Sequence, residues 1–219
     1  MKLYSGPLSL FTAKVRIALA EKELAVDRVE VGWTLQDRYL PHHPEVVALN
    51  PKGQVPVLVD GDVVVTDSTR ILEYLEDRCP TPPLFPADPA GRARARQLEA
   101  WADEDLFPTV WTFIEEAFYP AEQAAEGRDA ERLETARREL AAHHALLDKE
   151  LTSREWLAGD RFGVADIGAF VFVSAVATMG GAPDPGHGAL LAWMQRCAAR
   201  PSVAADMAAM VAFRASLAS

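Results

Sequence analysis

The chain has 219 residues, and 49% of them are apolar, which is enough to bury a core and too much for a disordered chain. Its 22 Lys and Arg residues against 32 Asp and Glu residues give a formal net charge of −10. A surface this acidic repels phosphate backbones and anionic lipids, so the composition argues against binding to nucleic acid or to a membrane surface.

The first 80 residues mix strand and helix patterns. The predicted elements are, in chain order, a strand at Lys2–Tyr4, a helix at Ser9–Glu23, a strand at Val26–Val31, a hairpin of Val57–Val59 and Val63–Val65, and a helix at Ser68–Arg78. An Asp-Gly-Asp turn joins the two hairpin runs, as is typical of a tight hairpin. A further short helix fits between the second strand and the hairpin. The order β-α-β-(α)-β-β-α predicts an α/β domain over residues 1–79.

A proline-rich segment, residues 80–89, follows and predicts a linker, because neither a helix nor a central strand tolerates this density of proline. Beyond it, apolar residues recur at helical spacing with almost no strand pattern. We expect helices near 90–118, 129–151, 164–179, 187–199 and 201–216. Residues 90–219 therefore predict an all-α domain.

The cysteine count limits the chemistry. Cys79 and Cys197 are far apart, which excludes a disulfide scaffold and a Cys-x-x-Cys site and suits a reducing cytosol. No spacing of His, Cys and Asp suits zinc, so no metal is expected. The longest apolar stretch, residues 167–179, is too short to span a bilayer, and no amino-terminal signal is visible. We expect a cytoplasmic protein.

Hydroxyl groups cluster at the start of the first predicted helix. Ser9 can cap this helix, or it can donate a hydrogen bond to a bound thiolate with support from the helix dipole. Ser5 and Thr12 are neighbouring hydroxyls that compete for the second role. On the local sequence alone, capping is the simpler interpretation.

Two later segments also have both an ordinary and a functional interpretation. A cis Val55–Pro56 bond would turn the Val55 backbone outward for pairing with an extended peptide, whereas a trans bond at a strand start is the ordinary case. Asp67 or Ser68 is a natural N-cap for the next helix, and a helix N-terminus is also a ready site for a carboxylate.

Two further patterns lie in the helical half. Gly163 at an N-cap and Asp166 three residues later give half of a capping box, which concerns folding. The pair His143–His144 lies on a polar helix and is expected at the surface.

The three amino-terminal segments, in this order and spacing, resemble the cytosolic glutathione S-transferase family, in its serine-type bacterial form. The most specific parts are the run from Asn50 to Leu75 and the segment Gly159–Asp166, although Gly163 stands where the family usually has Ser or Thr. The resemblance covers essentially the whole chain. It implies a thioredoxin-like glutathione-binding domain, an all-helical domain that completes the pocket for the electrophile, and a homodimer.

The resemblance also assigns site residues. It implies that Ser9 stabilises the glutathione thiolate and that Pro56 is a structural cis-proline. It implies that glutathione is bound by four residues, Gln54, Val55, Asp67 and Ser68. Phe11 and Trp111 are the expected lining of the electrophile pocket, which is apolar in such enzymes.

The predicted function is therefore a glutathione transferase that uses glutathione as co-substrate and a hydrophobic electrophile, in a detoxification role. Two alternatives stay open. One keeps glutathione and changes the reaction to peroxide reduction, dehalogenation or β-ether cleavage. The other is a non-catalytic interaction protein on the same fold, such as the stringent starvation proteins. Retention of Ser9, Gln54 and the Asp67–Ser68 pair argues against the second.

Overall fold

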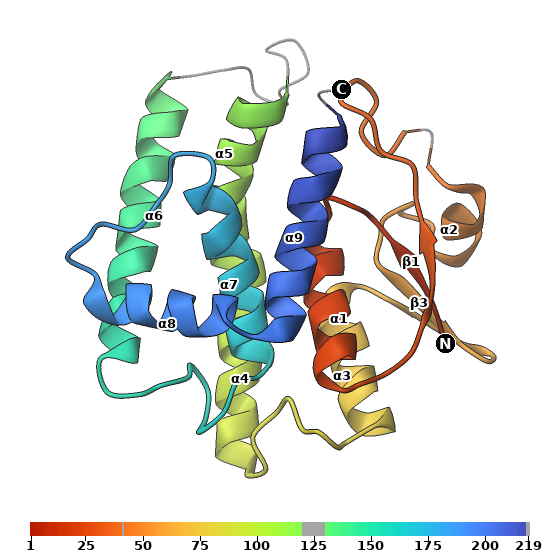
Figure 1. The fold of residues 1–219 in the computed structure, drawn as a ribbon, viewed down its shortest axis with the longest axis horizontal. Helices are drawn as coiled ribbons and strands as arrows, with labels where there is room; N and C mark the ends of the chain where they lie inside the picture. The colour runs from red at the N-terminus through yellow and green to blue at the C-terminus, as the bar shows by residue number, and fades with distance from the viewer. Residues whose placement is uncertain (41, 120–129, 218–219) are drawn as a thin grey trace. The chain divides into compact units, whose positions relative to one another are not determined.

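The structure, a computed structural model, describes residues 1–40, 42–119 and 130–217. The chain divides into two compact units, Met1–Leu84 with Arg200–Ser219, and Phe85–Ala199. Figure 1 shows the sheet in the first unit and the helices of the second. The strands and helices predicted for residues 1–79 are present, with ends that differ by at most two residues.

A four-stranded sheet organises the amino-terminal unit, with the order β2-β1-β3-β4. Its strands are β1 (Lys2–Ser5), β2 (Asp27–Glu30), β3 (Val57–Asp60) and β4 (Val63–Thr66). Strand β1 is parallel to β2 and antiparallel to β3, and β4 returns antiparallel to β3. In this register Tyr4, Val57 and Thr66 form one row across the sheet. The end of β1, the start of β3 and the end of β4 therefore share one edge.

The helices of this unit are α1 (Leu10–Glu21), α2 (Pro44–Leu49), α3 (Ser68–Arg78) and α9 (Pro201–Ser216). Helix α1 packs against both α3 and α9. Alternation along β1 sends Leu3 and Tyr4 to opposite faces of the sheet, and both are buried. Tyr4 joins a separate apolar cluster with Val31, Val46 and Val57, which includes α2. The sheet is thus covered on both faces, as a three-layer α/β unit requires.

Helix α9 groups with the amino-terminal unit and not with the helices that precede it in the chain. Arg200, just before α9, donates to the carboxylate of Glu21 at the end of α1, at 2.9 Å from its Nε. Ser202 in the first turn of α9 donates to the same carboxylate. These bonds join residues 179 and 181 positions apart in the sequence.

A buried ammonium group lies at the carboxy-terminal end of α1. Lys22 Nζ donates to the Glu76 carboxylate at 2.7 Å and to the carbonyls of Cys79 and Pro82 at 2.7 and 2.9 Å. Glu76 also accepts from the backbone N–H of Leu84 at 3.0 Å. A buried charge needs such a set of partners, and this one ties α1 to the end of α3 and to the proline-rich segment.

The carboxy-terminal unit is helical in its described residues. Its elements are α4 (Pro89–Trp101), a π-helical turn η1 (Ala102–Leu106), α5 (Phe107–Phe118), α6 (Ala130–Leu151), α7 (Val164–Ala177) and α8 (Gly188–Ala198). Helices fill the ranges predicted for this unit, although the range 90–118 holds α4, η1 and α5 in place of one helix. The start predicted for one of them, residue 129, lies outside the described residues.

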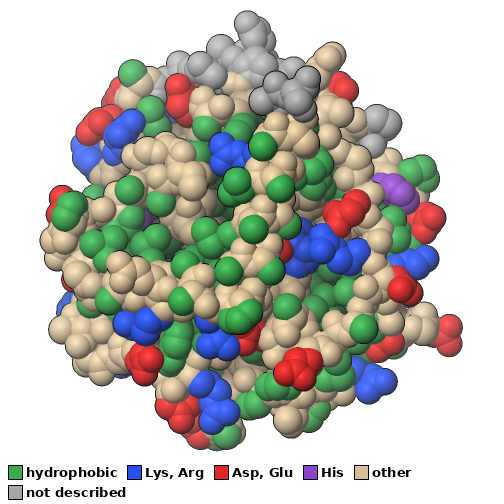
Figure 2. Space-filling model, viewed as in Figure 1, with side chains coloured by type: hydrophobic (Ala, Val, Ile, Leu, Met, Phe, Trp, Pro, Cys, Tyr) green, Lys and Arg blue, Asp and Glu red, His purple; other side chains and the backbone are tan. Residues whose placement is uncertain are grey.

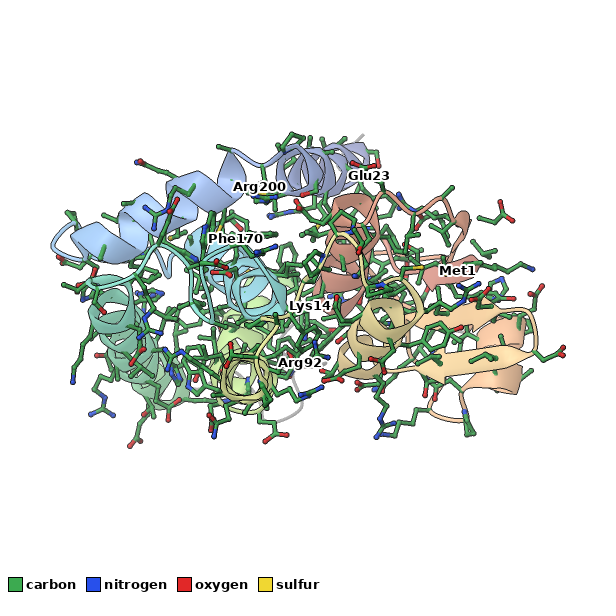
Figure 3. All side chains as sticks on the ribbon, turned by 90° about the horizontal axis from the view of Figure 1, so that it is seen from below. Met1, Lys14, Glu23, Arg92, Phe170 and Arg200 are labelled. Carbon is green, nitrogen blue, oxygen red and sulfur yellow. The ribbon has the colours of Figure 1, made fainter. Side chains whose placement is uncertain are left out.

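The single helix predicted over 90–118 is interrupted by η1, just before Pro108 near the start of α5. Proline has no N–H to donate, and its ring clashes with the carbonyl four residues earlier, which a wider π turn relieves. Helix α7 is buried along nearly its whole length, and Phe170 on it, labelled in Figure 3, is one of the largest fully buried side chains.

The surface mixes charges of both signs. On the face that Figure 2 shows, Lys and Arg side chains and Asp and Glu side chains are both scattered among apolar ones. In the described part of the chain, no helix is long and apolar enough to cross a membrane. Neither Cys79 nor Cys197 forms a disulfide bond.

Candidate functional site

Three loops meet at one edge of the sheet because of the strand register. The loop after β1 leads to Ser9, the segment before β3 holds Val55 and Pro56, and the turn after β4 holds Asp67 and Ser68. The row of Tyr4, Val57 and Thr66 places all three on the same side. The structure thus brings together the three segments that the sequence singled out.

Ser9 is the N-cap of α1. Its backbone is extended, with φ −76° and ψ 115°, and its Oγ accepts a hydrogen bond from the Thr12 N–H at 3.1 Å. Ser9 is half-buried, whereas the side chains of the two competing residues, Ser5 and Thr12, have no exposed surface. Of these three residues, Ser9 alone has exposed surface that a ligand can contact. Its proton is free of the cap bond, because Oγ is the acceptor there.

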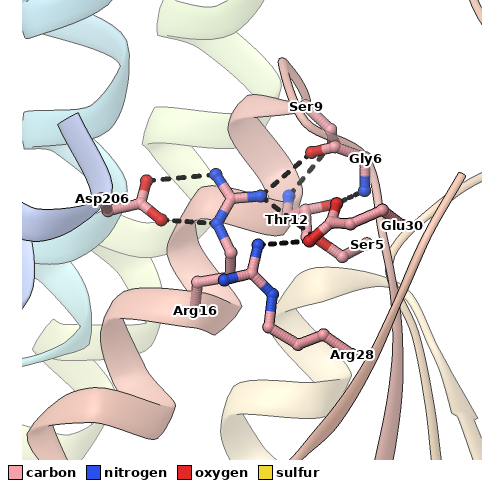
Figure 4. Close-up of polar contacts among 8 residues, drawn as sticks. All are labelled: Ser5, Gly6, Ser9, Thr12, Arg16, Arg28, Glu30 and Asp206. Carbon is pink, nitrogen blue, oxygen red and sulfur yellow. Dashed lines mark hydrogen bonds and ion pairs between the residues drawn. The ribbon is translucent and has the colours of Figure 1, made fainter. Parts of the chain in front are cut away.

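Gly6 is the first residue of the loop between β1 and α1 (Figure 4). Its N–H donates to Thr12 Oγ1 at 3.4 Å, and its carbonyl accepts from the Ser9 N–H at 3.2 Å. A Cβ at this position would lie 2.6 Å from the Tyr39 hydroxyl and 2.9 Å from Ser9 Cβ. Only glycine lets the Tyr39 ring approach the loop so closely.

The Val55–Pro56 peptide bond is cis, as the family resemblance implies. Val55 is half-buried and Gln54 is exposed, so both can meet a ligand. Asn50 shapes the preceding turn, since its side-chain amide donates to the Gln54 carbonyl at 2.8 Å and its Oδ1 accepts from the Lys52 N–H at 3.2 Å. The turn therefore holds Gln54 and Val55 in place without using their side chains.

Asp67 and Ser68 begin α3. Asp67 is the N-cap, and its Oδ1 accepts from the Arg70 N–H at 3.3 Å. Its φ of 78° lies in the left-handed region, which is uncommon for a residue other than glycine and costs free energy unless the surrounding structure holds it. Ser68 is 2% exposed, and its Oγ has no hydrogen-bond partner among the described residues. A buried hydroxyl without a partner is costly in a folded protein.

Phe11 and Trp111 lie in different units. Phe11 belongs to the first turn of α1, with Lys14 Nζ 5.8 Å from the centre of its ring. Trp111 is half-buried on α5 and contacts Phe107 and Tyr119, with ring centres 6.0 and 5.5 Å apart. Trp111 is thus part of an aromatic row along α5.

Tyr4 is the tyrosine nearest to Ser9 in the sequence, and its hydroxyl is already bound to another side chain. Its hydroxyl donates to the carboxylate of Glu45, and this hydrogen bond raises the pKa of Tyr4 above its ordinary value. The described residues contain no group of three or more His, Cys, Asp or Glu side chains that could hold a metal ion.

Sequence reasoning missed Arg16, whose guanidinium group lies beneath the loop that carries Ser9. Its Nη1 donates to the Gly6 carbonyl at 3.0 Å. The available signal was its position, because Ser9, Thr12 and Arg16 are spaced to share one face of a helix.

Two family models match this chain. The glutathione S-transferase N-terminal domain matches residues 3–83, and the glutathione S-transferase C-terminal domain matches residues 108–201. A curated relative, glutathione S-transferase GstB of Escherichia coli, is 30% identical over 194 residues, which cover 87% of this chain and 89% of that protein. The chain belongs to the glutathione S-transferase family and has its fold.

Other relatives differ in what their names record. FtsZ-localized protein A of Caulobacter vibrioides is 32% identical over 204 residues, which cover 91% of this chain and 87% of that protein. Among solved structures, a glutathione S-transferase of Methylobacterium radiotolerans in complex with glutathione sulfonate is 33% identical. The two structures match with a TM-score of 0.74, over 94% of this chain and 93% of that protein's chain.

Proposed function

We propose that this chain is a glutathione transferase, which holds glutathione along the shared edge of the sheet and activates its thiol as a thiolate. The observation that carries the proposal is the buried, unpartnered Oγ of Ser68 at the start of α3, on the same edge as the half-exposed Ser9. A hydroxyl kept in such a place at a cost to stability has a use when a ligand supplies its partner.

The γ-glutamyl end of glutathione fits the start of α3. Its α-carboxylate would accept hydrogen bonds from the Ser68 hydroxyl and from the free N–H groups of the first helical turn. Asp67 is exposed, so its carboxylate can pair with the ammonium group of the same unit. The resemblance assigns the cysteinyl backbone to Val55 and the glycyl end to Gln54, which lie on the neighbouring segment.

Ser9 would act as a hydrogen-bond donor and not as a nucleophile. Its hydroxyl donates to the glutathione sulfur, while the positive end of the α1 dipole adds to the stabilisation of the anion. A thiol with a pKa of about 8.5 that is lowered by about two units is mostly ionised at neutral pH. The thiol proton leaves to solvent. The sulfur then forms a bond to the electrophilic carbon, and the displaced group departs with its bonding electron pair.

The second substrate is proposed to be a hydrophobic electrophile. Phe11 on α1 and Trp111 on α5 are the proposed lining residues, and both offer apolar ring surface. By the same family resemblance, we propose that the protein acts in detoxification, as a cytoplasmic homodimer. Whether the protein catalyses conjugation, peroxide reduction, dehalogenation or β-ether cleavage is proposed to depend on this pocket and not on the sulfur site.

A non-catalytic role is the second candidate. It is favoured by the similarity to FtsZ-localized protein A, whose name records an association with another protein and not a reaction. An interaction protein has no need of an unpartnered Ser68 hydroxyl or of a left-handed Asp67 at a ligand-accessible helix end. This contrast is why we favour the transferase.

The test is to measure glutathione binding by calorimetry and thiolate formation by ultraviolet absorbance across a pH series. We expect the wild-type protein to bind glutathione with a lowered thiol pKa, and Ser9→Ala to bind it with a thiol pKa near that of free glutathione. Ser5→Ala is the matched control and should keep the lowered value. Absence of glutathione binding to the wild-type protein would overturn the proposal in favour of the interaction role. A loss of the thiolate in Ser5→Ala alone would overturn the assignment to Ser9.

A further inference from the structure

Arg16 and Asp206 form an ion pair between α1 and α9, inside the amino-terminal unit (Figure 4). The guanidinium Nε and Nη2 both donate to the carboxylate, the second at 3.1 Å. Arg16 is 8% exposed and Asp206 is 9% exposed, so the pair is removed from water. Two parallel hydrogen bonds of this kind fix the plane of the guanidinium group.

The rest of the guanidinium group faces the loop between β1 and α1. Nη1 donates to the Gly6 carbonyl at 3.0 Å and lies 3.4 Å from Ser5 Oγ. The same Gly6 carbonyl accepts from the N–H of Ser9. One carbonyl oxygen therefore links Arg16 to the backbone of the residue proposed to hold the sulfur.

The ion pair has its positive end toward the loop. The guanidinium group of Arg16 contacts the loop between β1 and α1, and the carboxylate of Asp206 on α9 lies on the other side of that guanidinium group. A guanidinium group stays charged in proteins, and a pair buried from solvent is screened less than one at the surface. The electrostatic potential of the pair on the side of the loop is thus positive, and its size depends on how far the charge of Asp206 offsets that of Arg16.

We propose that Arg16 is a positioning residue for the sulfur site, and that Asp206 on the carboxy-terminal helix sets how strongly its charge stabilises the glutathione thiolate. The inference rests on the proposed function, because it concerns the same bound thiol. It adds to that function a control of the amino-terminal site by a residue 190 positions later in the chain. Arg16 acts through Gly6 and through space, not by contact with the ligand.

Other charged groups near this loop stay constant in the test. Strand β2 contributes an exposed ion pair of Arg28 and Glu30, which has little net field and is screened by solvent. Lys14 on α1 is buried beside Phe11. None of these residues is altered by a substitution at Arg16 or Asp206, so differences between variants report the pair itself.

The test is the pKa of the thiol of bound glutathione, measured by thiolate absorbance in the full-length protein. Arg16→Gln removes the positive group and leaves Asp206 uncompensated, so we expect the thiol pKa to rise by about one unit. Asp206→Asn leaves the guanidinium group uncompensated, so we expect the thiol pKa to fall by about half a unit or more. The double variant, in which both charges are absent, should lie between the two single variants.

The opposite signs separate an electrostatic role from damage to the fold, since a loosened loop would raise the thiol pKa in both single variants. Arg16→Lys should restore most of the wild-type value because it keeps the charge. Arg200→Gln is the control for docking of α9, because it weakens the bond to Glu21 at the other end of α1. It should leave the thiol pKa unchanged.

Three results are decisive. If wild-type protein binds glutathione with a lowered thiol pKa but both single variants match it, or both shift upward, the inference is wrong and the proposed function stands. If wild-type protein binds no glutathione, the proposed function itself fails. Opposite shifts in the two single variants, with recovery in Arg16→Lys, support the inference.

Discussion

The indole Nε1 of Trp193 on α8 donates to the Asp166 carboxylate on α7 at 2.8 Å, in the interior of the carboxy-terminal unit. The same carboxylate accepts from the backbone N–H groups of Leu157 at 3.0 Å and Gly163 at 3.1 Å. Asp166 thus completes its half of the predicted capping box. Its other hydrogen bonds link α7 to α8 and to the segment before α7. Its burial raises the pKa of Asp166 to about 6, against the lowering effect of these hydrogen bonds.

Removal of this carboxylate should destabilise the carboxy-terminal unit. Asp166→Ala leaves three buried N–H donors without an acceptor, and each such group costs about 1 kcal/mol or more. We expect the free energy of unfolding to fall by about 3 kcal/mol or more, as measured by chemical denaturation. Asp160→Ala is the matched control, because its side chain is exposed, and it should change stability little. Equal effects of the two substitutions would contradict this role.

The expectation that the His143–His144 pair is at the surface was wrong for His144. His144 is 3% exposed and faces His187, with ring centres 6.4 Å apart, while His143 contacts Trp101. Burial, with smaller contributions from His187 and His143, lowers the pKa of His144 to about 4. A polar helix face can still be covered by another segment, and the sequence alone does not show which.

The titration of His144 should make stability fall in mild acid. Between about pH 6.5 and pH 4 the unfolded chain binds a proton that the folded unit excludes, so folding loses free energy as the pH falls. His144→Gln cannot take up this proton. We expect the stability of the wild-type protein relative to His144→Gln to decline by up to about 2 kcal/mol between pH 7.5 and pH 5.

The measurement is chemical denaturation of both proteins at the two pH values. Asp166 titrates in the same range with the opposite sign, since a raised pKa favours the folded state as the pH falls. It is present in both proteins, so it cancels in the comparison. If the difference in unfolding free energy between the two proteins is the same at both pH values, the folded unit does not exclude the proton from His144, and this prediction is wrong.

Gly6→Ala should disturb the sulfur site more than the fold. The added Cβ would meet the Tyr39 hydroxyl at 2.6 Å and Ser9 Cβ at 2.9 Å, so the Tyr39 ring and Ser9 must move away from it. A displacement of this kind can reduce the rate of a transfer reaction by about tenfold to a hundredfold. Glutathione affinity should change less, because the start of α3 is untouched.

Steady-state kinetics with an aryl halide and calorimetry with glutathione are the measurements. Gly32→Ala is the control, because a Cβ there meets nothing within 4 Å, and its kinetics should match the wild-type protein. Unchanged kinetics in Gly6→Ala would mean that the position of Ser9 does not limit the reaction.

The sequence predicted most of the elements because their signals are local. The apolar spacing of α3, the Asp-Gly-Asp turn of the hairpin and the Gly163–Asp166 cap each need only a few neighbouring residues. The convergence of Ser9, Val55 and Ser68 followed from family motifs, which carry tertiary information that a single pattern lacks.

The contacts that escaped prediction are long-range pairs of charges. Arg16 could pair with any of the 32 acidic residues, and nothing local indicates Asp206. The grouping of α9 with the amino-terminal unit is accompanied by this pair and by the bonds to Glu21. The π-helical turn also escaped, because Pro108 near a helix start is compatible with both a new helix and a distorted one.

Ser68→Ala should separate stability from binding. In the described structure the Ser68 hydroxyl is buried without a hydrogen-bond partner, so its removal relieves a desolvated group and leaves the fold unchanged or stabilised by up to about 1 kcal/mol. In the complex the same hydroxyl is proposed to donate to the γ-glutamyl carboxylate. Loss of a hydrogen bond to a charged group costs about 1.5–3 kcal/mol, which corresponds to a rise of about tenfold to a hundredfold in the glutathione Kd.

Thermal unfolding without ligand and calorimetry with glutathione measure the two effects of Ser68→Ala. Ser68→Thr is the companion variant, because it keeps the hydroxyl and should keep more of the affinity. A destabilised Ser68→Ala protein with unchanged affinity would show that the hydroxyl serves the fold and not the ligand.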